Sequence, residues 1–325
     1  MNTDEIADQV DLALLAELSL NGRESLTLLA RKLGLSKQRL SYRLRALQRR
    51  GVLTGFFAIP NIFRLGFDHF RVFVRFQRLT EAGEKELLDH LLTRSDVSWL
   101  TQLDGDFDLE FVVWAQGVPA FESAYDDILG QFGPLFQEKY FSLATRIEFR
   151  PWRFLAVGAA APGEGVVLES RPGPIAIDAI DRRLLAELSR NGRLSLAALA
   201  ARCRISPASA AQRLRALRRS GAVAGFGAKI DHVLLGRVYR KVFLRLEQPA
   251  GAPLDRLCAW LRARPEVIFL VKTVGGYDLE VELMTGPGGE FLAFMRRLRT
   301  EFAAEIAAFR SVIVLRELKY GQYPA

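Results

Sequence analysis

The chain has 325 residues, half of them hydrophobic, and a formal net charge of +8 with a pI near 9.7. This length predicts two or more domains with cores of their own, and the excess of basic residues indicates a polyanionic partner. The two cysteines, Cys203 and Cys258, show neither metal-binding spacing nor a disulfide pattern. We therefore expect a protein of a reducing compartment that holds no metal ion and no cofactor.

Three short helices are predicted near the N-terminus. Apolar residues repeat at helical spacing over residues 12–18 and 26–33, on either side of the turn Asn21-Gly22-Arg23, and Gly34 closes the second helix. Ser36 then caps a third helix that Gly51 ends. The exposed faces of the third helix carry basic residues and no acid: Lys37, Arg39, Arg43, Arg45, Arg49 and Arg50. This is the layout of a helix-turn-helix, whose third helix enters the major groove of DNA.

The whole pattern occurs twice, with an offset of 170 residues. Asn21-Gly22-Arg23 returns as Asn191-Gly192-Arg193, and 25 of the 48 aligned pairs from residue 11 to residue 58 are identical. The register continues without a gap to Gly105 and Gly275. Such self-similarity indicates one two-part unit in duplicate.

Each unit continues with the order β-α-β-β-α-β, which predicts a ferredoxin-like sandwich. In the first unit the alternation of apolar residues predicts strands at 69–77, 97–103, 107–115 and 136–149 and helices at 81–92 and 119–131. In the second unit the corresponding segments are 239–247, 254–263, 267–274, 277–285, 291–302 and 309–319. The predicted class is α+β, with two helix-turn-helix domains alternating with two sandwich domains.

The expected domains are a first helix-turn-helix (1–60), a first sandwich (61–150), a second helix-turn-helix (178–230) and a second sandwich (231–325). Residues 151–177 are rich in Ala, Gly and Pro, and the run from 159 to 165 has the composition of a flexible linker.

The sequence resembles the Lrp/AsnC family, the feast/famine regulators. The resemblance rests on the Asp-led first helix, Asn-Gly-Arg, the Ser-capped Arg-Leu-x-x-Leu helix, Gly-Val-Leu-x-Gly-Phe and Gly-x-Phe/Tyr-Asp, and it covers nearly the whole chain outside the linker. It implies winged-type DNA-binding domains, sandwich domains that dimerise, and small effectors, usually amino acids, bound near the Gly-x-Phe/Tyr-Asp loop. This chain differs by fusing two units, so we expect the sandwiches to pair within one chain, edge to edge or face to face, with a further homo-oligomer.

The candidate DNA-binding residues of the first unit lie mostly in the first two turns of the third helix: Ser36, Lys37, Gln38, Arg39, Tyr42, Arg43 and Arg45. Arg39 or Lys37 could read guanine, and Gln38 could read adenine. Arg45 suits a phosphate, and Arg43 could instead pair with an acid such as Glu17.

The second unit offers Ser206, Ser209, Gln212 and Arg213, with its other basic residues late in the helix. We expect it to bind mainly phosphates; loss of DNA binding is the other interpretation.

The candidate effector loops contain Gly105, Asp106 and Asp108 in the first unit and Gly275, Tyr277 and Asp278 in the second. Glycine lets backbone N–H groups turn toward a carboxylate, and an aspartate could pair with an ammonium group. A plain β-turn explains the same residues, and only the resemblance favours a pocket.

The sequence therefore predicts a DNA-binding transcriptional regulator rather than an enzyme. We expect it in the cytoplasm, on the nucleoid, because the N-terminus lacks a signal peptide and no apolar segment is long enough for a bilayer. The competing function is that of a sirohaem decarboxylase, a tetrapyrrole enzyme of the same fold that also occurs as two-unit fusions. A ligand-sensing scaffold without DNA contacts is a third possibility.

Overall fold

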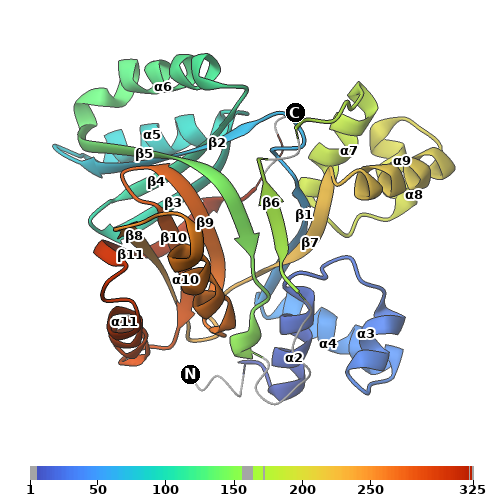
Figure 1. Cartoon of the computed structure of the whole chain (residues 1–325). Coiled ribbons are helices and arrows are strands. Elements are labelled where there is room, and N and C mark those ends of the chain that lie inside the picture. The colour runs from blue at the N-terminus through green and yellow to red at the C-terminus, as the bar shows by residue number, and fades with distance from the viewer. Residues whose placement is uncertain (1–5, 156–163, 171–172, 322, 324–325) are drawn as a thin grey trace.

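The computed structural model describes residues 6–155, 164–170, 173–321 and 323 (Figure 1). The first helix-turn-helix consists of α2 (Gln9–Leu18), α3 (Leu26–Lys32) and α4 (Lys37–Arg49), followed by strand β1 (Leu53–Pro60). The second consists of α7 (Ala179–Arg190), α8 (Leu196–Cys203) and α9 (Pro207–Arg219), followed by β7 (Val223–Ile230). Ser36 and Ser206 cap the third helices as expected, because their hydroxyls accept hydrogen bonds from the N–H groups of Arg39 and Ser209 at 3.2 and 3.1 Å.

Both sandwich units have the predicted β-α-β-β-α-β order, and the α+β class is confirmed. The first unit contains β2 (Asp68–Phe76), α5 (Glu81–Thr93), β3 (Val97–Gly105), β4 (Leu109–Ala115), α6 (Val118–Phe132), the 3-10 turn η1 (Gly133–Leu135) and β5 (Phe136–Phe149). The second contains β8 (Val238–Leu246), α10 (Gly251–Ala263), β9 (Val267–Gly275), β10 (Leu279–Thr285), α11 (Glu290–Glu301) and β11 (Ile306–Lys319).

The two units share one closed sheet. Strand β5 pairs with β2 of its own unit and with β9 of the other, and β11 likewise pairs with β8 and β3. The cyclic order is β2-β4-β3-β11-β8-β10-β9-β5, closed by the β2–β5 pairing. The units therefore join at their edges, and the closed sheet leaves none of these eight strands as a free edge.

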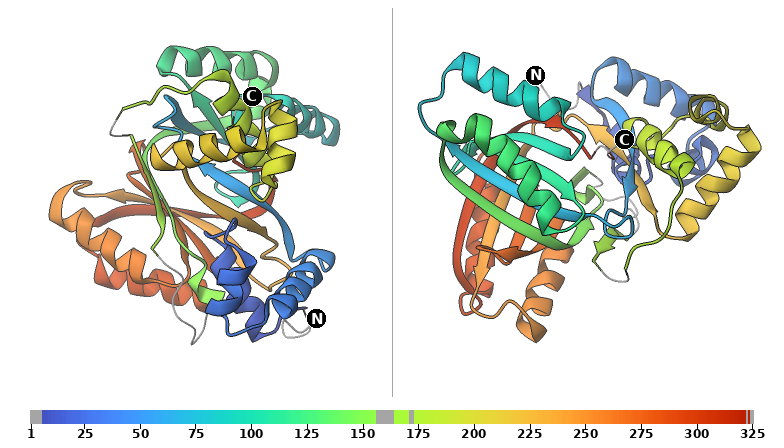
Figure 2. Two further views of the ribbon diagram at one scale, coloured as in Figure 1. Left: turned by 90° about the vertical axis from the view of Figure 1, so that its right-hand side faces the viewer. Right: turned by 90° about the horizontal axis from the view of Figure 1, so that it is seen from above.

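The helices of each unit cover the outer face of the closed sheet (Figures 1 and 2). Alternate residues of β2, such as Phe70, Val72 and Val74, pack outward in the cluster that includes the buried residues of α5 and α6. The residues between them face the interior, where Arg71 is 1% and Phe73 0% exposed. Both faces of the strand are buried, because the sheet curls upon itself.

The segment between the units is more ordered than its composition suggests. It contains the 3-10 turn η2 (Arg153–Leu155), with Phe154 and Leu155 buried, and strand β6 (Val166–Glu169), which pairs antiparallel with the end of β5. The prediction of a flexible linker over 151–177 is wrong for these residues, because β6 pairs with residues 146–149 of β5, beyond the part of β5 that pairs with β2. Most of the Ala/Gly/Pro run at 159–165 lies outside the described residues.

Candidate nucleic-acid interface

The two helix-turn-helix domains are held as a pair by a two-stranded ribbon. Strands β1 and β7 pair antiparallel, with Phe56 opposite Ala228. Both domains lie along this ribbon on one side of the closed sheet (Figure 2).

Each Asn-Gly-Arg turn docks on the ribbon strand of the other unit. The N–H of Gly22 donates to the carbonyl of Phe226, and the N–H of Gly192 donates to that of Phe56, both at 2.8 Å. Arg193 lies over the ring of Phe56, 4.9 Å from its centroid, and its guanidinium donates to the carbonyl of Glu24 at 2.8 Å. The repeated motif therefore fixes the position of one DNA-binding domain relative to the other.

Glycine is required in these turns because the backbones approach closely. A Cβ on Gly22 would overlap the carbonyl oxygen of Gly227, and a Cβ on Gly192 would lie 2.7 Å from the carbonyl carbon of Phe57. Ordinary side chains do not make such contacts, so only glycine fits here.

The third helix of the first unit presents its predicted contact residues to solvent. Lys37, Gln38 and Arg39 are exposed, and Tyr42 is 65% exposed. The sandwich domains do not cover them. The helix is therefore open to a duplex, with Arg45 and Arg49 exposed further along.

Arg43 and Arg213 are engaged within their own domains. Arg43 binds Asp8 and Asp11 at 2.7 and 2.8 Å, and Arg213 binds Asp178 and Asp181 at 2.7 and 2.9 Å. The hydrogen bonds that the guanidinium of Arg43 donates to Asp11 and Asp8 raise the pKa of Arg43. These ion pairs tie the first helix to the third.

The structure corrects the partner proposed for Arg43, because Glu17 instead pairs with Lys32 at 2.8 Å. The signal was present in the sequence, since Asp8 and Asp11 recur at 178 and 181 together with the arginine.

The third helix of the second unit is less polar at its start. Ser209 is half-buried and Gln212 exposed, whereas the basic residues cluster near the end, where Arg215, Arg218 and Arg219 are exposed. The capping role of Ser206 uses its hydroxyl as an acceptor, which leaves the O–H available to donate.

The two candidate effector loops meet at one pocket of about 520 Å³. The last strands of both units and both loops line it: Phe107, Glu138, Lys139, Tyr140, Arg245, Gly276, Tyr277, Ala308, Phe309 and Arg310. Of the six predicted effector residues only Tyr277 lines this pocket, and its N–H donates a hydrogen bond to the hydroxyl of Tyr140 at 2.7 Å. Asp106 lies at its edge, 3.9 Å from Arg310.

The other predicted effector residues have structural roles. The carboxylates of Asp108 and Asp278 accept hydrogen bonds from the N–H groups of Phe76 and Leu246 at 2.6 and 2.8 Å, so they tie strands together rather than face the pocket. Gly105 and Gly275 have φ values of +130° and +147° and press against the last strand of the other unit. No local pattern singled out Glu138, Arg245 and Arg310, because the pairing of strands across the two units brings Glu138 to the same pocket as the two arginines.

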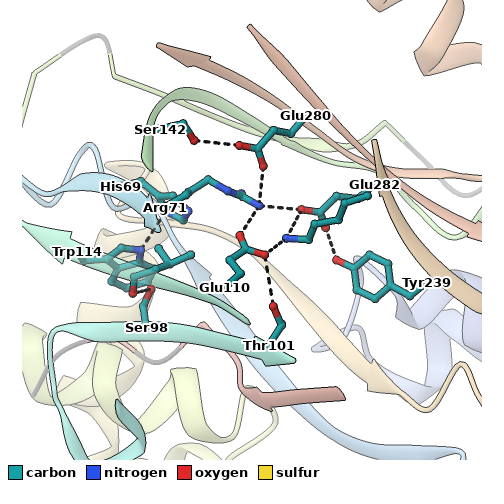
Figure 3. Close-up of polar contacts among 12 residues, drawn as sticks. His69, Arg71, Ser98, Thr101, Glu110, Trp114, Ser142, Tyr239, Glu280 and Glu282 are labelled. Carbon is teal, nitrogen blue, oxygen red and sulfur yellow. Dashed lines mark hydrogen bonds and ion pairs between the residues drawn. The ribbon is translucent and has the colours of Figure 1, made fainter. Parts of the chain in front are cut away.

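A buried charge cluster fills the interior of the closed sheet (Figure 3). One guanidinium nitrogen of Arg71 lies 2.8, 3.0 and 3.1 Å from carboxylate oxygens of Glu110, Glu280 and Glu282. Lys241 pairs with Glu110 and lies 3.2 Å from Glu282. These five side chains, defined here as the inner cluster, are at most 1% exposed.

The inner cluster holds three carboxylates against two cations, so one acid is poorly compensated. Burial raises the pKa of Glu280 to about 7 despite the nearby Arg71. Burial acts on Glu282 in the same direction, but Lys241 and Arg71 outweigh it and hold its pKa below the ordinary value. Glu280 is therefore the acid that carries a proton near neutral pH.

Within the described ranges, no group of three His, Cys, Asp or Glu side chains is arranged to hold a metal ion. None of the described helices is long and apolar enough to cross a bilayer.

The geometry defines a protein with paired winged helix-turn-helix domains on a shared, closed sheet. A family model described as "Winged helix-turn-helix DNA-binding" matches residues 8–54 and 177–224. The proline dehydrogenase transcriptional activator of Rhodobacter capsulatus is 31% identical over 120 residues, which are 37% of this chain and 78% of that protein. The leucine-responsive regulatory protein of Salmonella typhimurium is 36% identical over 86 residues, 26% of this chain and 51% of its own length.

The chain belongs to the Lrp/AsnC family of DNA-binding transcriptional regulators and carries the family's unit twice. Its whole length also resembles a crystal structure of the siroheme decarboxylase NirDL, with a TM-score of 0.60 at 13% identity over 98% of this chain and 93% of that chain. At this identity the likeness concerns the fold alone.

Proposed function

We propose that this protein regulates transcription by placing both third helices on one operator with unequal half-sites. The observation that carries the proposal is the exposed basic face of α4, held at a fixed position relative to α9 by the ribbon and the docked turns. Because the two domains belong to one chain and differ in sequence, an asymmetric site is expected.

Helices α4 and α9 have different proposed roles in binding DNA. Lys37, Gln38, Arg39 and Tyr42 at the start of α4 suit base edges in the major groove. The exposed arginines late in α9 suit phosphates, which position a protein without reading sequence. Arg43 and Arg213 orient the helices through their aspartates rather than reading bases.

The pocket between the two loops is the proposed effector site. Glu138 offers a carboxylate for an ammonium group, and Arg245 and Arg310 offer cations for a carboxylate, on opposite units of the chain. An α-amino acid has both groups, so it fits this chemistry. An effector that bridges the units could bias their arrangement and with it the DNA-binding pair. We place the protein in the cytoplasm, on the nucleoid, with homo-oligomers of the whole chain as its working form.

The test is selection of bound genomic fragments by the full chain, followed by footprinting with and without a panel of amino acids. We expect a protected site with two unequal halves and binding that weakens steeply with salt. Arg245→Ala should remove the response to an amino acid and leave binding of the unliganded protein unchanged. Absence of a preferred fragment, or binding that does not depend on salt, would contradict the proposal.

A second function, tetrapyrrole decarboxylation, is favoured by one observation, the likeness to NirDL over the whole chain. The test that distinguishes the enzyme from the regulator is incubation of the purified protein with a tetrapyrrole. Absorbance spectroscopy then detects binding, and mass analysis detects loss of carbon dioxide. A bound, decarboxylated tetrapyrrole would favour the enzyme over the regulator.

A further inference from the structure

A second cavity, of about 60 Å³, lies between strand β1 and the interior of the closed sheet. Its walls are mostly apolar and come from both units and from the ribbon: Phe57, Ile59, Ile62, Trp114, Ile147 and Val271. Two polar side chains of β2, His69 and Arg71, also line it and are 6% and 1% exposed. It shares no lining residue with the pocket between the loops.

His69 brings a hydrogen-bond donor to the lining of this cavity. The Nε1–H of Trp114, which can only donate, points to Nδ1 of His69 at 3.0 Å (Figure 3). Nδ1 must then be the unprotonated nitrogen, and Nε2 carries the hydrogen of the neutral ring. Burial, with Arg71 and Lys241 nearby, lowers the pKa of His69 well below its ordinary value and keeps the ring neutral. Nε2 is buried and has no partner among the described residues.

Arg71 supplies a second donor. Its terminal nitrogen binds the carboxylates of the inner cluster, whereas its Nε–H is buried without a partner in the described part of the chain. The one carboxylate that lines the cavity, Glu282, is already bonded to Tyr239, Lys241 and Arg71. The cavity therefore presents unpaired donors and no unpaired carboxylate. Buried donors that remain unpaired cost free energy, so a hydrogen-bond acceptor in this cavity would stabilise the protein.

We propose that this cavity binds a small, mostly apolar molecule with one carbonyl or carboxylate group, which accepts hydrogen bonds from His69 and Arg71. An α-amino acid is excluded because its ammonium group would face donors and apolar walls. A water needs roughly 10–15 Å³ of such space, so the cavity holds about as many non-hydrogen atoms as a short branched carboxylic acid or ketone.

Both hydrogen-bond donors of the site come from the first unit, although the walls come from both. The position equivalent to His69 in the second unit is Tyr239, whose hydroxyl donates a hydrogen bond to the carboxylate of Glu282. Residues 57–60 of β1 form one wall, so an occupant contacts the ribbon that carries both DNA-binding domains. Ligand binding to this cavity is measured without DNA. A negative result here is therefore distinct from a failure of the protein to bind an operator.

The experiment titrates the full-length protein with isobutyrate, with 3-methylbutan-2-one, which has nearly the same shape without the charge, and with L-alanine. Readouts are tryptophan fluorescence, because Trp99 and Trp114 line the cavity, and thermal unfolding. We expect a saturable change for at least one of the first two probes, with a Tm increase of roughly 3 °C at a hundredfold excess over Kd, and none for L-alanine. Preference for the ketone identifies a neutral carbonyl ligand, and preference for isobutyrate a carboxylate.

Matched variants locate the site. Ala58→Leu fills the cavity and should abolish the change, whereas Ala228→Leu, at the duplicated position outside it, should retain it. His69→Phe keeps an aromatic ring at this position and removes the hydrogen-bond donor. We expect it to lower ligand affinity by at least about tenfold. It locates the site if Ala58→Leu does not fold. No saturable change with either probe, an equal response to L-alanine, or binding unaffected by both Ala58→Leu and His69→Phe would overturn the proposal.

Discussion

The inner cluster shows how a residue's role depends on the face it occupies. Alternation along β2 places Phe70, Val72 and Val74 on one side, and the usual expectation for the other side of a strand is solvent. Arg71 lies on that other side and is nevertheless 1% exposed, because closure of the sheet buries it. Its charge is tolerated only because carboxylates from both units surround it.

Glu280 should make stability depend on pH. Its pKa is raised to about 7 in the folded protein, so between pH 4.5 and 7 the folded state binds more protons than the unfolded state. The stabilisation that this extra proton on Glu280 gives the folded state is complete below pH 4.5 and is lost as the pH rises through 7. We expect Glu280→Gln to gain up to about 3 kcal/mol of unfolding free energy relative to the parent between pH 5 and pH 8.

Urea unfolding of both proteins at several pH values measures this difference. His69, whose lowered pKa works in the opposite direction below pH 6.5, is present in both proteins and cancels. Parallel stability curves for the two proteins would show that Glu280 does not hold the extra proton.

Arg39 should read a base rather than hold a phosphate. Replacing Arg39 by Ala is expected to cost roughly 1–3 kcal/mol on the selected operator and less on random DNA. Arg49→Ala, further along the exposed face of α4, should weaken binding to both DNAs alike and lower the salt dependence by about one unit. Gel-shift titrations at several salt concentrations measure both quantities, and equal losses for Arg39→Ala on the two DNAs would make it a phosphate contact.

At the scale of elements, the Asn-Gly-Arg turn is a docking surface. Its two copies bind the ribbon strands reciprocally, so each helix-turn-helix is supported by the other unit. The turn was predicted from composition, but its function was not, because the receiving residue lies 204 positions away for Gly22 and 136 positions away for Gly192.

Gly22→Ala should loosen this arrangement. The added methyl group meets the carbonyl of Gly227, and such overpacking costs about 1–3 kcal/mol. Operator affinity should fall with it, because the two third helices lose their fixed spacing. Differential scanning calorimetry and gel shifts measure the two effects.

Gly130→Ala is the matched control, since it lies in helix α6 with open space around its Cβ position and should be neutral or slightly stabilising. Equal behaviour of the two variants would contradict the docking role of Gly22.

At the scale of the whole molecule, the inner cluster opposes the pairing of two second units. A pair of first units would bring together two copies each of Arg71 and Glu110, with Val112 in place of Glu282. A pair of second units would bury two lysines with four glutamates, from positions 280 and 282. In its balance of buried cations and carboxylates, the mixed pair lies between these two cases. The fusion of both units in one chain enforces this mixed pair.

Two separately produced halves, residues 1–155 and 164–325, should therefore associate when mixed. Each half presents unpaired edges of β3, β5, β9 or β11, which pair across the units in the whole chain. We expect a 1:1 complex in light scattering and no stable dimer of the second half alone at neutral pH, because the excess of buried carboxylates opposes it. Lys241→Leu in the second half should weaken the mixed complex. Halves that remain monomeric together would contradict a shared sheet as the main contact.

The sequence by itself determined the duplication, the helix caps, the order of strands and helices and the basic face of α4, because these depend on local spacing and on residue types within a short segment. Tertiary structure alone decided which side chains meet. Closure of the sheet across the two units buries Arg71 with three glutamates and brings Glu138 to one pocket with Arg245 and Arg310. Packing within each unit makes Asp108 and Asp278 tie strands together. These contacts join residues far apart in the chain, and no local pattern encodes which edge a strand will pair with.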